Sequence, residues 1–139
     1  MKIIIKNFQK KVPICPKRIK KAILKVFSQE ALEKTGEITI CFVTDKKIRE
    51  LNLRYLGKNQ PTDVLTFDNT SPLDNAHMCA DIIISTDTAM RNARIFKTTP
   101  VDELNLYAVH GALHLLGYDD HTPKQRKLMR QKEEEYVHT

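Results

Sequence analysis

The sequence predicts an α/β domain in which about five helices pack on one mixed sheet of about four strands. A length of 139 residues is that of one domain, and a hydrophobic fraction of 41% is enough for a core. Segments with the two-residue period of strands alternate with segments of helical spacing. No internal repeat or linker marks a second domain, so residues 1–139 are expected to form a single unit.

In the N-terminal part of the chain, the sequence predicts a strand at residues 2–8 and a helix at residues 17–34. Pro16 suits the first turn of that helix. Apolar residues recur on one helical face, at Ile19, Ala22, Ile23, Val26 and Phe27. Lysines form the opposite face, and no acidic residue precedes Glu30. This face either contacts phosphates or is simply a solvated surface of an amphipathic helix, and both interpretations stay open.

In the middle of the chain, the sequence predicts a strand, a short helix and a second strand. Residues 37–43 alternate apolar and polar side chains, as a strand does. Asp45 is expected to cap a helix that ends near Gly57. Residues 54–61 are predicted to form a loop, and residues 62–67 form the next β-rich run.

A second loop is expected at residues 68–78, followed by a central strand at residues 81–85. Three consecutive isoleucines predict that this strand is buried on both faces. Thr86 or Asp87 is expected to cap the next helix, which runs to about Lys97.

Two helices complete the chain. Thr99 and Pro100 resemble the start of a capping box, so a helix is predicted from Pro100 to about Leu116. Leu104, Ala108 and Ala112 recur at helical spacing, which predicts packing against the sheet. The same capping logic at residues 122–125 predicts a final charged helix that runs to about residue 136.

Two histidines four residues apart, His110 and His114, share one face of the predicted helix. Imidazoles in that arrangement can both bind one zinc ion. Gly117 predicts the end of the helix, after which the chain can present Asp120 or His121 to the same metal. Three protein ligands with an open position are typical of a catalytic zinc site. The alternative is a pair of helix histidines with ordinary hydrogen-bond partners.

Gly111 follows the first histidine, at the position where zinc proteases of the H-E-x-x-H type carry their general base. A glycine cannot serve as a base, which argues against a protease of that type. It is also expected to leave open space beside the metal for a bulky substrate.

Three stretches together resemble the YbeY family, metal-dependent endoribonucleases linked to ribosomal RNA maturation. They are His110-Gly-Ala-Leu-His114-Leu-Leu-Gly-Tyr, Asn52 and Tyr55 with Pro-Thr-Asp-Val-Leu-Thr-Phe at residues 61–67, and Ala-Asp-Ile-Ile-Ile-Ser at residues 80–85. Asp120 stands at the family's third histidine position, with His121 beside it. Leu56 stands where many members carry an arginine.

The resemblance implies one zinc ion per chain, bound by His110, His114 and Asp120. His121 is expected to move a proton or to replace Asp120 as ligand, Arg54 to neutralise charge on the phosphate, and Lys58 to bind substrate. The implied activity is endonucleolytic cleavage of single-stranded RNA. The implied role is small-subunit (16S) ribosomal RNA maturation and ribosome quality control, with the small ribosomal subunit as partner.

Two other functions stay open. The protein is either an RNA-binding factor for ribosome assembly whose metal is structural, or a metallohydrolase of another substrate. A closed site that uses both Asp120 and His121 would favour the binding factor, and an open position would favour the enzyme.

The net charge of +6 favours anionic partners such as nucleic acid. Three widely spaced cysteines form no zinc-binding or disulfide pattern and fit a reducing compartment. No apolar run is long enough to span a membrane or to form a signal peptide, so the protein is expected in the cytoplasm. No feature of the sequence fixes an oligomeric state.

Overall fold

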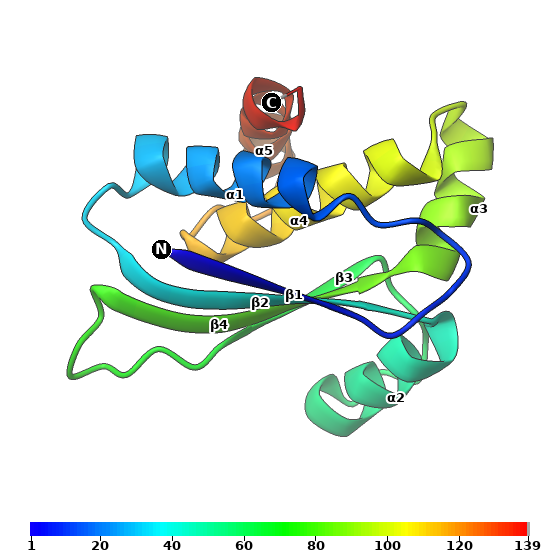
Figure 1. Ribbon diagram of the computed structural model, residues 1–139, viewed down its shortest axis with the longest axis horizontal. Coiled ribbons are helices and arrows are strands. Elements are labelled where there is room, and N and C mark those ends of the chain that lie inside the picture. The colour runs from blue at the N-terminus through cyan, green and yellow to red at the C-terminus, as the bar shows by residue number, and fades with distance from the viewer. Residues whose placement is uncertain (139) are drawn as a thin grey trace.

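A four-stranded mixed sheet lies at the centre of the computed structural model, which describes residues 1–138 (Figure 1). Its strands are β1 (Lys2–Asn7), β2 (Thr35–Val43), β3 (Val64–Asp68) and β4 (His77–Ser85), in the order β1-β2-β4-β3. The pairs β1–β2 and β2–β4 are parallel, whereas β3 is antiparallel to β4. The predicted fold class is confirmed.

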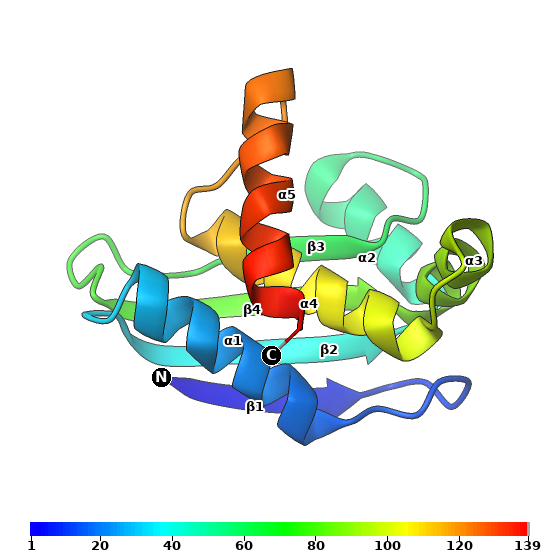
Figure 2. The same ribbon diagram turned by 90° about the horizontal axis from the view of Figure 1, so that it is seen from above.

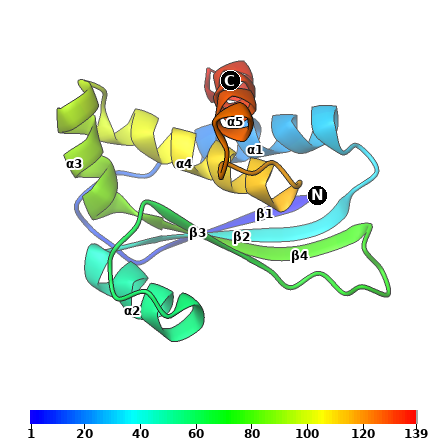
Figure 3. The same cartoon turned by 180° about the vertical axis from the view of Figure 1, so that it is seen from behind.

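Three helices lie on one side of the sheet, namely α1 (Pro16–Glu30), α4 (Pro100–Leu115) and α5 (Pro123–Val137) (Figure 1). Seen from above, α5 crosses over α4 (Figure 2). The helix α2 (Asp45–Leu56) lies against the opposite face, and α3 (Thr86–Phe96) stands at one end of the sheet (Figure 3). The helix α4 therefore lies between the sheet and α5.

Burial follows the predicted patterns. The five apolar residues predicted on α1 are all buried against the sheet. On β4, Ile82 and Ile84 belong to the same large hydrophobic core as these α1 residues. Ile83 instead packs into a smaller hydrophobic cluster with Ile48 of α2. The predicted burial of this central strand on both faces is confirmed.

Two predicted helix caps are wrong by one or two residues. Thr44, rather than Asp45, caps α2, because its side chain accepts a hydrogen bond from the Lys47 backbone N–H. Ser85 caps α3 and accepts from the Thr88 N–H, in place of Thr86 or Asp87. The two predicted acids have other roles: Asp45 accepts hydrogen bonds from Ser85, Thr88 and Arg91, and Asp87 pairs with Lys11.

Two predicted boundaries differ from the structure by four residues, at the end of α1 and at the start of β4. The helix α1 ends at Glu30 instead of residue 34, since Ala31 already has non-helical backbone angles. The helix α2 ends at Leu56 with Gly57 as its C-cap, as predicted, so the first three residues of the predicted loop at residues 54–61 are helical. The strand β4 begins at His77 instead of residue 81, because it pairs with the whole of β2. Within residues 1–138, none of the helices combines the length and apolar character that a membrane span requires.

Candidate metal centre

The helix α4 carries both histidines, as predicted. Thr99 caps its first turn by accepting a hydrogen bond from the Asp102 N–H, and Pro100 occupies the first position. The side chains of His110 and His114 lie on the same face, with ring centroids 4.5 Å apart and planes at 83°. They are 21% and 24% exposed, so they are largely enclosed but remain reachable from solvent.

A glycine turn after α4 directs the chain back toward these histidines. Gly117 has φ of 97°, in the region that favours glycine. The Tyr118 N–H donates to the Leu113 carbonyl at 3.1 Å, and the Gly117 N–H donates to the His114 carbonyl at 3.0 Å. This paired pattern is the Schellman motif, which ends the helix and starts the segment that contains Asp120.

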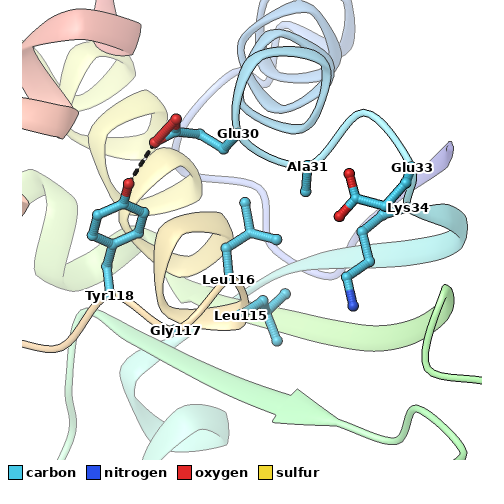
Figure 4. A pocket seen from close by; sticks show the side chains of 8 residues that line it. All are labelled: Glu30, Ala31, Glu33, Lys34, Leu115, Leu116, Gly117 and Tyr118. Atoms are coloured by element: carbon cyan, nitrogen blue, oxygen red, sulfur yellow. Dashed lines mark hydrogen bonds between the residues drawn. The ribbon is translucent and has the colours of Figure 1, made fainter.

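A polar contact between distant segments fixes this turn (Figure 4). The Tyr118 hydroxyl donates to Glu30 Oε1 at 2.6 Å, and Lys132 Nζ of α5 lies 3.0 Å from the same carboxylate oxygen. Burial opposes ionisation of Glu30, but the hydrogen bonds from Tyr118 and Lys132 outweigh it and lower the pKa of that carboxyl. The residue two positions before Asp120 is thus anchored to both α1 and α5.

Three ligand-type atoms meet at the end of α4. Asp120 Oδ2 lies 3.6 Å from Nε2 of His110 and 3.6 Å from Nε2 of His114. All three atoms lie within 4.8 Å of one another. Two ligands of a tetrahedral zinc ion lie about 3.4 Å apart, given bonds of about 2.1 Å. The separations therefore suit a single small divalent cation, whereas 3.6 Å is too long for a direct hydrogen bond.

The pKa of His110 is raised above its ordinary value. Burial lowers it, but the hydrogen bond between Nδ1 and Glu133 Oε1, at 3.1 Å, outweighs that effect, and the charge of Glu133 adds to it. Glu133 belongs to α5, which the sequence predicted only as a charged helix. Its spacing to Met129 and Tyr136, which are both buried, was the available signal that it faces inward.

The three ligand-type side chains border a cleft of about 400 Å³, a volume in the range of small-ligand sites. Its other walls come from α2, the following loop and β3: Asn52, Leu56, Lys58, Gln60, Thr62, Asp63, Val64, Leu65 and Thr66. Lys58 is the basic residue among them. The predicted substrate-binding lysine and the three predicted ligands are therefore brought together.

Arg54 and His121, the two residues predicted to act in catalysis, do not line this cleft. Arg54 borders a separate hollow on α2, with Lys47 and Glu50 among its neighbours. On a helix, Asn52 and Leu56 share a face, and a residue midway between them points to the other side. His121 is exposed, and its backbone N–H donates to Gln125 at the start of α5.

Gly111 does not create open space beside the metal site, so that expectation is wrong. The residue is buried and faces the sheet. A Cβ atom there would lie 2.9 Å from Ile82 Cγ2 and 3.4 Å from Thr66 Cγ2. The glycine instead allows α4 to approach β3 and β4 closely, which places both histidines above the sheet.

Replacing Gly111 with alanine is expected to destabilise the protein by about 1 kcal/mol. Overpacking against Ile82 costs roughly 1–3 kcal/mol, and the better helix propensity of alanine returns up to about 1 kcal/mol. Urea denaturation of both proteins measures the difference. An equal or higher stability of the variant would contradict the close packing of α4 on the sheet.

Fold and site together define an α/β protein with a candidate His–His–Asp metal centre beside an open cleft. The model of the family described as "Endoribonuclease YbeY" matches residues 4–139. The chain belongs to the YbeY family, as its three sequence stretches indicated.

Individual relatives agree with this assignment. The protein named "Endoribonuclease YbeY" of Syntrophus aciditrophicus is 39% identical over 141 residues, covering 97% of this chain and 87% of its own. The protein of the same name from Pelotomaculum thermopropionicum is 36% identical over 145 residues, covering 99% and 95%. The solution structure of TM1509 from Thermotoga maritima superimposes with a TM-score of 0.63 at 31% identity, covering 97% and 86%.

Proposed function

We propose that this protein is a metal-dependent endoribonuclease that hydrolyses single-stranded RNA, with zinc as its metal and small-subunit ribosomal RNA as its substrate. Membership of the YbeY family supports the activity. The observation that carries the proposal is structural: three ligand-type atoms lie within 4.8 Å of one another at the wall of an open cleft.

The proposed ligands are Nε2 of His110, Nε2 of His114 and a carboxylate oxygen of Asp120. Two imidazoles and one carboxylate form a donor set that zinc accepts in hydrolytic enzymes. A divalent metal held there supplies Lewis acidity, which lowers the pKa of water and stabilises negative charge on a phosphoryl oxygen. Since zinc is among several cations that such ligands bind, metal analysis of the purified protein is the direct check of its identity.

The geometry favours an enzyme over an assembly factor with a structural metal. A structural zinc site has four protein ligands, whereas a catalytic one has three and an open position. Within residues 1–138, the cluster that can hold a cation contains three residues, and His121 is not one of them. The cleft beside these residues has a volume of about 400 Å³, in the range of small-ligand sites.

Lys58 is the proposed phosphate-binding residue. It lines the same cleft as the ligands, and so does Leu56, which stands at the position where many family members carry an arginine. A lysine ammonium near the phosphate offsets the charge that develops during hydrolysis. Arg54 is proposed to contact the RNA only outside the cleft, and His121 to transfer protons only if the segment around it moves.

Replacing Lys58 with alanine is expected to lower kcat/KM for a single-stranded RNA oligonucleotide by about 10²-fold, the lower end for loss of one preorganised group. Arg54→Ala is the matched control, because that arginine lies on the same α2–loop segment but outside the cleft. The Arg54→Ala change is expected to alter kcat/KM by less than about 5-fold, because a surface charge acts mainly by steering the RNA toward the protein.

Steady-state cleavage of a fluorescent oligonucleotide measures both variants. A large loss in Arg54→Ala with little loss in Lys58→Ala would contradict the assignment of the phosphate contact. Tight RNA binding without cleavage by the zinc-loaded wild type would instead favour the assembly factor.

A further inference from the structure

Glu133 of α5 contacts one ring nitrogen of His110, while Asp120 lies near the other. Its Oε1 lies 3.1 Å from His110 Nδ1, while the other ring nitrogen, Nε2, lies 3.6 Å from Asp120 Oδ2. An ionised carboxylate accepts hydrogen bonds and cannot donate one. The proton of this contact therefore resides on Nδ1, and in neutral His110 the lone pair resides on Nε2.

The carboxylate of Glu133 is held in place mainly by this contact. Its side chain is 15% exposed, and it follows Met129 at the spacing of the buried face of α5. Within residues 1–138, its one polar side-chain contact is the one with His110. A largely buried carboxylate is costly without a partner, so its orientation toward the imidazole is well defined.

We propose that Glu133 is a positioning residue of the metal centre: it accepts the Nδ1 proton of His110 and so fixes the ring with Nε2 facing Asp120. The binding of a metal by Nε2 rests on the proposed function, whereas the tautomer of His110 does not depend on it. Carboxylates that accept from a metal-binding histidine in this way set the ring orientation and increase the basicity of the ligand nitrogen.

The two histidines differ in this respect. Among residues 1–138, His114 has no hydrogen-bond partner for its Nδ1, and its ring is placed by edge contact with the His110 ring. The same short segment of α5 also contributes Lys132, which anchors the turn before Asp120 through Glu30. Glu133 thus acts on the histidine that has a hydrogen-bond partner for its Nδ1, while Lys132 acts on the turn before Asp120.

Two measurements test the proposal. The first is zinc affinity by competition with a chromophoric chelator, for wild type, Glu133→Ala, Glu133→Gln and the neighbouring control Glu134→Ala. Glu134 is exposed and pairs with His138 at the end of α5, away from the ligands. The second is the tautomer of His110, from the ¹⁵N chemical shifts of its ring in chelator-treated protein at alkaline pH, where the imidazole is neutral.

We expect Glu133→Ala to weaken zinc binding about 10–100-fold, the usual effect of removing such a partner. Glu133→Gln is expected to lose less, because its amide oxygen still accepts the Nδ1 proton, and Glu134→Ala is expected to bind as the wild type does. His110 is expected to be protonated at Nδ1 in the wild type, with an Nε2-protonated population appearing in Glu133→Ala.

A wild-type His110 protonated at Nε2 would overturn the proposal without recourse to any variant. So would a folded Glu133→Ala protein with wild-type affinity and an unchanged tautomer. A wild-type protein that binds no metal contradicts the proposed function instead, and the tautomer of His110 then still decides the role of Glu133.

Discussion

Replacing His114 with alanine is expected to abolish RNA cleavage and to weaken zinc binding by more than about 100-fold, since even partners that only support a ligand are worth up to that factor. His114 and His110 together provide the nitrogen ligands from one helical face, and Asp120 Oδ2 lies 3.6 Å from the Nε2 atom of each. Without His114, two protein ligands remain, which is fewer than the three of a catalytic zinc site.

His77→Ala is the matched control for this variant. His77 is an exposed residue at the start of β4 and has no place in the cleft. Bound zinc is measured by atomic absorption, cleavage on a single-stranded oligonucleotide, and folding by circular dichroism. A folded His114→Ala protein that cleaves RNA at the wild-type rate would rule out the proposed metal centre.

The second large effect is expected from a change of Asp120, the third proposed ligand. Asp120→Asn keeps the size of the side chain but removes its charge, and a neutral amide is a poor ligand for zinc. Zinc affinity and kcat are both expected to fall by at least about 10-fold, the lower limit for loss of a group that supports the metal.

His121→Ala is the variant to compare with Asp120→Asn. The His121 side chain is exposed and outside the ligand cluster, so its loss should leave zinc affinity unchanged. The chelator competition assay distinguishes the two residues. Loss of affinity in His121→Ala, with normal affinity in Asp120→Asn, would show that the chain shifts by one residue to present the imidazole instead.

Much of this site could be predicted from the sequence because its signals are local. The spacing of His110 and His114 fixes their common face once a helix is given, and Thr99 with Pro100 marks where that helix begins. Gly117 marks where it ends, so a ligand shortly afterwards was expected. The resemblance then favoured Asp120, and the structure brings it within reach of both histidines.

Other features depend on contacts between distant segments. Whether Gly111 faces the metal or the sheet depends on how α4 rotates against Ile82. The charge of Arg54 favours a catalytic role, but its position on α2 relative to Asn52 and Leu56 turns it away from the cleft. The partner of His110 lies 23 residues further along the chain, on a helix that the sequence predicts only as a charged one.

The most direct test of the proposed function relates bound metal to activity in one protein. The wild type is treated with a chelator, dialysed and titrated with zinc, and both bound zinc and cleavage of single-stranded RNA are measured at each step. We predict no cleavage by the stripped protein and a rate that rises in proportion to bound zinc until about one ion per chain is reached, as expected for one three-ligand site. Full cleavage by the stripped protein, or one bound zinc per chain with no cleavage, would contradict a metal-dependent nuclease.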